Sequence, residues 1–258
     1  MSKYLKSEFY RILHIRSSYV FVAICSLLLL SSNILLAIVK QADSSFKHAT
    51  TYFSLGNVCT SMAMVFLLCI MVSNMIFGNE YNSNTLKNSI SYGISRSTIY
   101  LSKMILQIVY SLAAFTIIIG IHVGSAYLLL EHSEEKSVEL LLSTCFAAIP
   151  LFLFVLAVTN CFSFLIESTG GTIAATCGVL LALPLVSTLL GMKFEVARKF
   201  SEILPWNLIN NMGFDLEKYK LMLFWETDGH LKYWIAGIIQ MLIFTALGYA
   251  LFRKKEIK

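Results

Sequence analysis

The chain has 258 residues, of which 57% are hydrophobic and 14% are charged, and its formal net charge is +5. A soluble domain has roughly a quarter of its residues charged, so this composition excludes a water-soluble globular protein and indicates an integral membrane protein. The basic residues are divided among short segments that flank apolar runs, which argues against a nucleic-acid-binding surface. The length allows about six spans in a single transmembrane domain, 1–258.

The N-terminal segment 2–17 is predicted to be a basic amphipathic helix. Its apolar residues fall on one helical face, and lysines and arginines accompany them: Leu5, Phe9, Ile12 and Leu13, with Lys3, Lys6, Arg11 and Arg16. Such a helix is suited to lie in the membrane interface before the chain turns inward. A soluble tail is the alternative interpretation.

Six apolar runs predict an all-α fold of six transmembrane helices. The expected spans are 19–39, 57–77, 104–130, 138–166, 172–192 and 233–252. The fourth run is too long for one untilted span and contains Pro150, so we expect a kinked or tilted helix there. Residues 193–232 form a long loop that begins with an amphipathic segment ending at Pro205.

The polar segment 78–103 lies between the second and third spans. Its pattern predicts a short helix from Thr85 to Ile90, capped by residues 82–84 and ended by Gly93 in a left-handed conformation, with Ser95 or Ser97 capping the next helix. A short helix held between two spans is suited to dock a partner. The alternative is a solvated loop that only reverses the chain.

The distribution of lysine and arginine predicts the orientation. On the side of the termini, the N-terminal segment, the 78–103 segment and the tail hold four, three and four of these residues, eleven in all. The short segments 40–56 and 131–137 on the other side hold two and one. The long loop holds six, but they are matched by six acids. We therefore expect both termini and 78–103 to be cytoplasmic.

The sequence lacks the signatures of an enzyme or an ion-coupled carrier. It contains no GxxxxGK[ST], GxSxG or HExxH motif, and no carboxylate lies in mid-span. The six cysteines lie in or beside apolar runs without metal-ligand spacing, so neither a metal site nor a disulfide framework is expected. The energy source of any transport is therefore expected to lie outside the chain.

A few polar residues interrupt the spans, and they are candidates for a substrate path: Asn33, Asn74, His122 and Asn160. The alternative is that they form hydrogen bonds between helices, which contribute roughly 0.6–2 kcal/mol each. Gly120 and Gly124 have small-xxx-small spacing, which would allow close helix packing.

Within 78–103, the residues Glu80-Tyr81, Thr85-Leu86-Lys87, Tyr92-Gly93-Ile94-Ser95-Arg96 and Lys103 resemble the coupling segment of type 2 ABC exporter permeases. The run LPWNLINN at 204–211 also resembles the outer segment of that family. The resemblance extends over the whole chain and is to the bacterial subgroup of bacitracin, lantibiotic and other peptide-antibiotic export or immunity. One departure is Asn84, which replaces the usual glycine and tolerates the same left-handed backbone.

The resemblance implies a bacterial cytoplasmic membrane protein that is not itself an enzyme and binds no cofactor. Two copies of a separate ABC ATPase would bind ATP and magnesium, and a second permease subunit, identical or homologous, would complete the unit in the lipid membrane. The implied coupling residues are Glu80, Tyr81, Thr85, Leu86, Lys87, Ile90 and Arg96, with Leu86 and Ile90 as hydrophobic plugs in the ATPase. A non-transporting sensor or scaffold subunit is the alternative.

Overall fold

The computed structural model describes residues 2–43, 45–77, 85–133, 136–210, 213–215, 220–222 and 230–255. The described chain is helical apart from loops and one short antiparallel hairpin of β1 and β2, so the predicted all-α class is confirmed. The elements are α1 (Ser2–His14), α2 (Arg16–Ala42), α3 (Thr51–Thr60), α4 (Ala63–Phe77), α5 (Thr85–Ser91), α6 (Arg96–Leu129), α7 (Ser137–Leu165), α8 (Thr169–Cys177), η1 (Gly178–Ala182), α9 (Leu183–Gly191), α10 (Glu195–Glu202), α11 (Pro205–Asn210), β1 (Gly213–Asp215), β2 (Lys220–Met222) and α13 (His230–Lys254).

Five helices among the described residues are long and apolar enough to cross a membrane: α2, α6, α7, α8 through α9, and α13. The bent pair of α3 and α4 adds a sixth candidate if it is counted as one span. The sequence places the second span at 57–77, but the helix begins at Thr51 and bends by 63° between Thr60 and Ala63. The early start follows from Thr50, whose side chain accepts a hydrogen bond from the Phe53 amide and caps α3.

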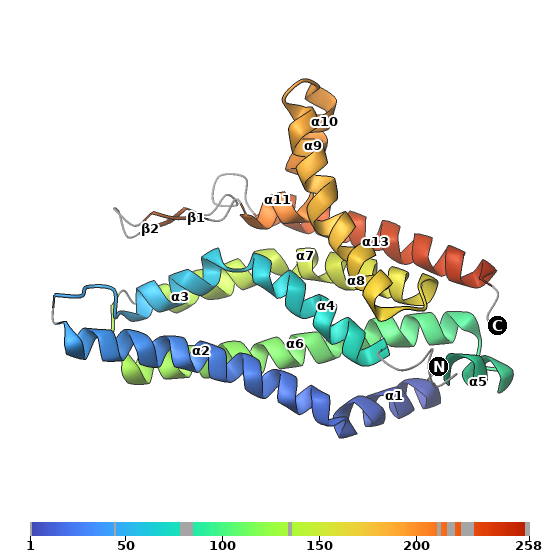
Figure 1. The fold of residues 1–258 in the computed structure, drawn as a ribbon, viewed down its shortest axis with the longest axis horizontal. Coiled ribbons are helices and arrows are strands. Elements are labelled where there is room, and N and C mark those ends of the chain that lie inside the picture. The colour runs from blue at the N-terminus through green and yellow to red at the C-terminus, as the bar shows by residue number, and fades with distance from the viewer. Residues whose placement is uncertain are drawn as a thin grey trace.

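Helix α6 also starts earlier than its predicted span of 104–130. It has 34 residues and begins at Arg96, so the last part of the 78–103 segment is helical. At 1.5 Å per residue the helix is about 50 Å long, roughly 20 Å more than the hydrocarbon core of a bilayer. Its first turns therefore extend beyond the core, at the end of the bundle where α5 and both termini lie (Figure 1). We call this the α5 end.

Helices α2, α6, α7 and α13 run along the long axis, and α13 lies against α7 (Figure 1). Two glycines of α13 make that packing close. A Cβ on Gly237 would lie 2.6 Å from the carbonyl carbon of Pro150, and one on Gly248 would overlap the hydroxyl of Tyr100. Pro150 lies inside a continuous α7, so it does not divide the helix. Within the described part of the chain, no atom lies within 4 Å of where a Cβ would stand on Gly120 or Gly124, so neither glycine makes a close contact there.

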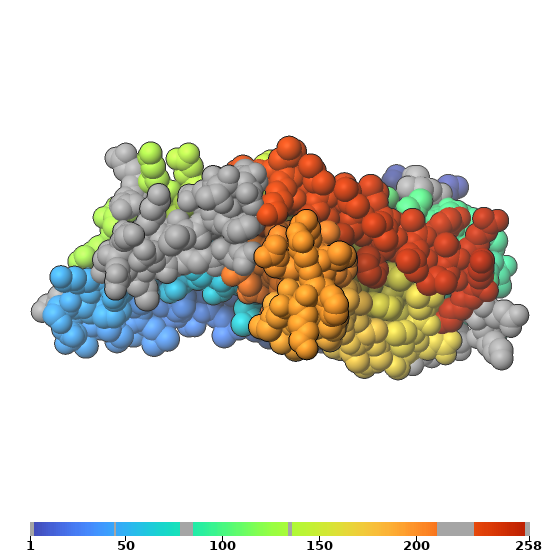
Figure 2. All heavy atoms as spheres, turned by 90° about the horizontal axis from the view of Figure 1, so that it is seen from above, coloured from blue at the N-terminus to red at the C-terminus, as the bar shows by residue number. Residues whose placement is uncertain are grey.

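The fifth span leaves the bundle at a steep angle, and α10 folds back on α9 to make a projecting hairpin (Figures 1 and 2). The span contains a π-helical turn, η1, in which the Leu183 amide donates to the Gly178 carbonyl. Pro184 follows directly. Because the ring of a proline clashes with the carbonyl four residues earlier, the wider π turn accommodates it.

A hydrophobic group at the α5 end joins six helices. We call it the junction cluster; its buried members are Ile12, Val72, Ile76, Phe77, Leu86, Ile99, Tyr100, Leu106, Phe164 and Phe252. The ring of Phe164 lies 5.0 Å from those of Phe77 and Tyr100 and 4.3 Å from that of Phe252. The cluster therefore connects α1 and α5 to the ends of the long helices.

Candidate functional site

The local structure around α5 follows from its capping residues. Gly93 has a φ of +83°, its amide donates to the Ile90 carbonyl, and the Ile94 amide donates to the Ser89 carbonyl. The Ser95 side chain accepts from the Thr98 amide and caps α6. The predicted helix, glycine stop and serine cap are thus confirmed. Glu80 and Tyr81, with the predicted cap at 82–84, lie outside the described residues.

Helix α5 turns its apolar side into the bundle and its polar side outwards. Leu86 is only 3% exposed and belongs to the junction cluster, and Ile90 is half-buried against that cluster. Thr85 and Lys87 are exposed, and Tyr92 just after the helix is 86% exposed. Leu86, expected from the sequence to be a hydrophobic plug, is covered here by the chain's own core, and its role in coupling stays a prediction.

Arg96 links the start of α6 to the end of α13. Its Nη1 donates to the carbonyl oxygens of Phe252 at 2.8 Å, Arg253 at 2.8 Å and Lys255 at 2.6 Å. A cation is favourable there because the last carbonyls of a helix have no partner within the helix. Arg96, predicted to be a coupling residue, thus contacts the chain itself.

Two further basic residues bind helix C-termini at the α5 end, and neither contact is predicted from the sequence. Lys255 donates from Nζ to the Leu165 carbonyl of α7 at 3.1 Å, and Arg11 donates from Nη2 to the Ile76 carbonyl of α4 at 2.8 Å. Both contacts join residues far apart in the chain, so no local pattern predicts them.

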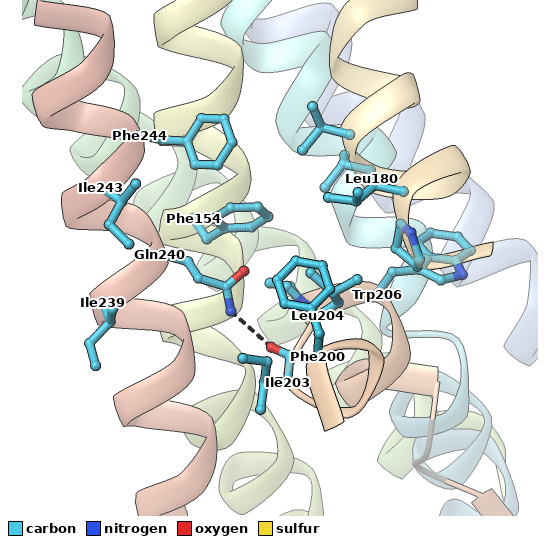
Figure 3. Close-up of a pocket in the computed structure, with 14 residues that line it drawn as sticks. Phe154, Leu180, Phe200, Ile203, Leu204, Trp206, Ile239, Gln240, Ile243 and Phe244 are labelled. Atoms are coloured by element: carbon cyan, nitrogen blue, oxygen red, sulfur yellow. Dashed lines mark hydrogen bonds between the residues drawn. The ribbon is translucent and has the colours of Figure 1, made fainter. Parts of the chain in front are cut away.

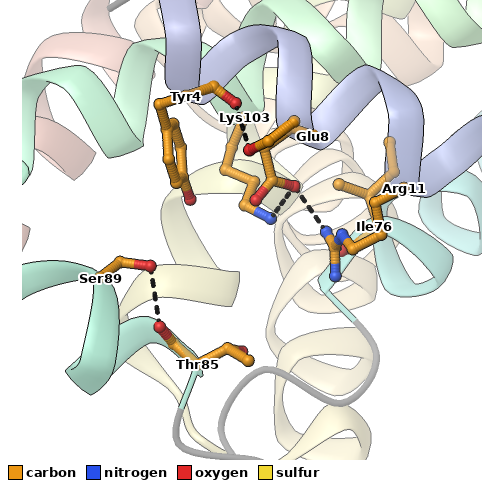
Figure 4. Close-up of polar contacts among 8 residues, drawn as sticks. Tyr4, Glu8, Arg11, Ile76, Thr85, Ser89 and Lys103 are labelled. Carbon is orange, nitrogen blue, oxygen red and sulfur yellow. Dashed lines mark hydrogen bonds and ion pairs between the residues drawn. The ribbon is translucent and has the colours of Figure 1, made fainter.

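A buried ion pair fixes α1 to α6 (Figure 4). Lys103 Nζ lies 2.7 Å from Glu8 Oε2, and Arg11 Nη2 is 2.7 Å from the same oxygen. The Lys103 side chain is fully buried, with Nζ 5.6 Å from the ring centroid of Phe77. Burial opposes ionisation of Glu8, but Lys103 and Arg11 outweigh it, so the pKa of Glu8 is lowered. The α1 helix is thereby held against the base of α6, close to α5.

Asn33 and His122, two of the predicted path residues, meet in a buried polar cluster where α2, α3 and α6 pack. The Asn33 amide donates to Ser125 Oγ at 2.7 Å and to the His122 carbonyl at 3.1 Å, and Ser54 donates to Asn33 Oδ1. Ser54 Oγ is also 3.3 Å from His122 Nε2. Hydrogen bonds between helices, the alternative interpretation of these residues, therefore account for this cluster.

Asn160 is not part of that cluster. The residue is fully buried on α7, where its side chain lies against the Tyr100 hydroxyl near the start of α6. Tyr100 and His122 are 22 positions apart on one helix, about 33 Å. Asn74 is half-buried on α4. The four predicted path residues thus do not converge on one site.

Among the described residues, no group of three histidine, cysteine, aspartate or glutamate side chains is placed to hold a metal ion. The cysteines of the described chain are free, and three of them are fully buried: Cys59, Cys69 and Cys161. The distinctive features of the described chain are mechanical, namely a braced short helix at one end and a projecting hairpin.

Comparison with models of known protein families matches residues 5–175 to the ABC-2 family transporter proteins. The match spans about two thirds of the chain and includes most of α1, all of α2 through α7 and the 78–103 segment, whereas residues 204–211 lie beyond it. A search of curated proteins finds no match to the chain. ABC-2 permeases generally pair with an ABC ATPase, and their membrane domain has no ATPase activity. The chain therefore belongs to the ABC-2 transporter family and is a multi-pass membrane permease component.

Proposed function

We propose that the chain is the membrane subunit of an ATP-driven ABC exporter, which moves a peptide antibiotic or another amphipathic or lipophilic substrate across or out of a bacterial cytoplasmic membrane. A separate ATPase chain, present twice, supplies the energy. Both termini and the α5 end face the cytoplasm in this proposal, as the lysine and arginine count indicates.

The observation that carries the proposal is the way α5 is mounted. Its buried side is anchored by Leu86 in the junction cluster, and the exposed residues Lys87, Asn88 and Tyr92 leave a polar and aromatic surface for a partner. In this proposal, a force applied to α5 would reach α1, α6 and α13 through the buried contacts of the junction cluster. That arrangement suits a helix that transmits the closure of two ATPases to the spans.

The projecting hairpin of α9 and α10 supports a second permease subunit in the assembly. Its exposed apolar side chains include Leu185, Leu189, Met192 and Val196, the last of which is 82% exposed. Asn207 braces the hairpin by donating to the Ser201 carbonyl at 2.8 Å. We propose that an identical or homologous subunit packs against this hairpin within the membrane.

Photo-cross-linking tests the coupling surface. A benzoylphenylalanine placed at Tyr92 is expected to cross-link to the ATPase when both chains are produced together in membranes. The matched control is the same probe at Leu128, which is 85% exposed but lies at the opposite end of α6. Equal cross-linking at the two positions, or none at position 92, would contradict the proposed interface.

A susceptibility panel separates export from the sensor or scaffold alternative. A deletion strain complemented with the unaltered chain is challenged with peptide antibiotics and lipophilic drugs. The same strain complemented with the double variant, Lys87→Glu with Tyr92→Ala, is tested in parallel. An exporter is expected to restore resistance to at least one compound only with a hydrolysis-competent ATPase, and the double variant should lower that resistance at unchanged protein level. Resistance that is independent of ATP hydrolysis would favour the sensor.

A further inference from the structure

An apolar cavity of about 300 Å³ lies between the fifth and sixth spans. Its walls come from η1, α9, α7 and α13, and α10 with α11 closes one end (Figure 3). Fourteen of the described residues line it, and among these only Gln240 and Trp206 carry a polar group on the side chain. The proposed coupling surface lies on α5 and does not include this cavity.

The wall chemistry selects an apolar occupant. Gln240 Nε2 donates to the Ile203 carbonyl at 2.8 Å, so its amide nitrogen is already engaged (Figure 3). The side-chain polar groups of the wall belong to Gln240 and Trp206 alone among the lining residues named, so most of its surface offers water no hydrogen-bond partner. An engineered apolar cavity of about 150 Å³ stays dry and binds benzene. A cavity of twice that volume has room for a larger apolar group, such as part of an alkyl chain.

The cavity borders the surface that faces the membrane. Ile239 and Ile243 on α13 are both 52% exposed, and Leu183 on α9 is 40% exposed, yet all three line the cavity. The acyl chain of a lipid can therefore enter the cavity laterally, between α9 and α13, from the surrounding membrane, where lipid is always present at high concentration. One wall, with Val179 and Leu180, is the π turn η1, and such turns occur frequently at functional sites.

We propose that this cavity binds one acyl chain of a membrane phospholipid, inserted laterally between α9 and α13. The inference depends on the cavity alone and holds whether or not the chain exports a peptide. Bound lipid would fill the space between the projecting hairpin and the bundle, so the hairpin would be supported on its inner side by lipid rather than by protein.

Tryptophan quenching by chain-brominated phospholipid tests this directly, because Trp206 lines the cavity. The full chain with Trp225→Phe and Trp234→Phe keeps Trp206 as its one tryptophan and is reconstituted in phosphatidylcholine vesicles. The control carries Trp206→Phe with the same two changes and Leu242→Trp, a position on α13 that is exposed and does not line the cavity. We expect brominated chains to quench at least half of the fluorescence in both proteins.

Filling the cavity then separates bound lipid from bulk lipid. Val179→Phe with Leu183→Phe adds volume at two lining positions and is expected to reduce quenching of Trp206 at least twofold while leaving the Leu242→Trp control unchanged. Quenching of Trp206 that persists unchanged in the filled variant would mean contact with bulk lipid and overturns the proposal. Absence of quenching in the unfilled protein overturns it too, because protein atoms would then occupy the space.

A second measurement on the unaltered chain does not depend on how the filled variant folds. Native mass spectrometry of the detergent-purified protein, after washing that removes bulk lipid, is expected to show one retained phospholipid per chain. A chain that retains no phospholipid, or that retains an apolar peptide in its place, refutes the assignment.

Discussion

Lys103 is fully buried and forms an ion pair with Glu8. Replacing Lys103 by methionine removes this buried positive charge. The two charged atoms are 2.7 Å apart, and the Glu8 side chain is 10% exposed. Removing one partner of a buried ion pair costs about 3–5 kcal/mol, because the other charge stays buried without compensation. Arg11 binds the same carboxylate oxygen and keeps part of the interaction, so we expect a loss near the lower limit, about 3 kcal/mol.

A double-mutant cycle measures the interaction itself. Glu8→Gln, Lys103→Met and the combined variant are compared with the unaltered chain by the free energy of unfolding in detergent micelles. The combined variant leaves no uncompensated charge on this pair, so it is expected to be more stable than the sum of the two single losses predicts, by 1 kcal/mol or more. Additive losses would show that Glu8 and Lys103 do not interact, and would refute the reasoning.

The chain supplies a matched control on its surface. Glu195 and Lys199 of α10 form a pair at 2.9 Å with side chains 67% and 70% exposed. Water screens such a pair, so Lys199→Met is expected to cost under about 1 kcal/mol. If Lys103→Met costs no more than Lys199→Met, burial is not the source of the effect.

Three further predictions follow from α1, α5 and α13. The folded pKa of Glu8 is lowered from its ordinary 4.5, so the ionised carboxylate should stabilise the fold above pH 4.5, and this stabilisation should be lost as the pH falls through the folded pKa. The thermal unfolding midpoint should therefore fall more steeply between pH 7 and pH 3 in the unaltered chain than in Glu8→Gln. Gly93→Ala should cost about 1–2 kcal/mol of unfolding free energy because φ is +83°, whereas Gly120→Ala, equally open in space but helical, should gain about 0.5–1 kcal/mol. Gly237→Leu should separate α13 from Pro150 and reduce the yield of monodisperse protein on size exclusion, and an unchanged elution profile would contradict the close approach.

The parts of the fold that the sequence predicts are those set by local chemistry. The α5 helix, its stop and the start of α6 depend on Gly93 and Ser95, which act on backbone groups within a few residues. Long apolar runs likewise predict spans because a bilayer requires about 20 apolar residues in succession. Such signals need no knowledge of the tertiary contacts.

The second span shows why features that depend on tertiary contacts are not predicted from the sequence. Thr51 and Ser54 lie in the polar segment 40–56, so the span predicted from the sequence begins at 57. The structure buries both, because Thr51 donates to the Ser133 carbonyl and Ser54 donates to Asn33. A buried polar side chain is acceptable only when a partner satisfies it, and here each partner is distant in the chain. Glu8 is a similar case, since its partner Lys103 is 95 positions away.

The basic residues at the α5 end have two roles. They indicate the orientation of the spans in the membrane, and several of them also bind helix carbonyls or Glu8 in the folded chain. Of the eleven that indicate the orientation, at least four are bound in the structure to a helix carbonyl or to Glu8: Arg11, Arg96, Lys103 and Lys255. The orientation signal depends on charge alone and acts while spans insert. The caps depend on geometry and form only when the spans have packed. Arg96→Lys would keep the charge but shorten the side chain whose Nη1 contacts the three carbonyls, so the two roles are separable at that position.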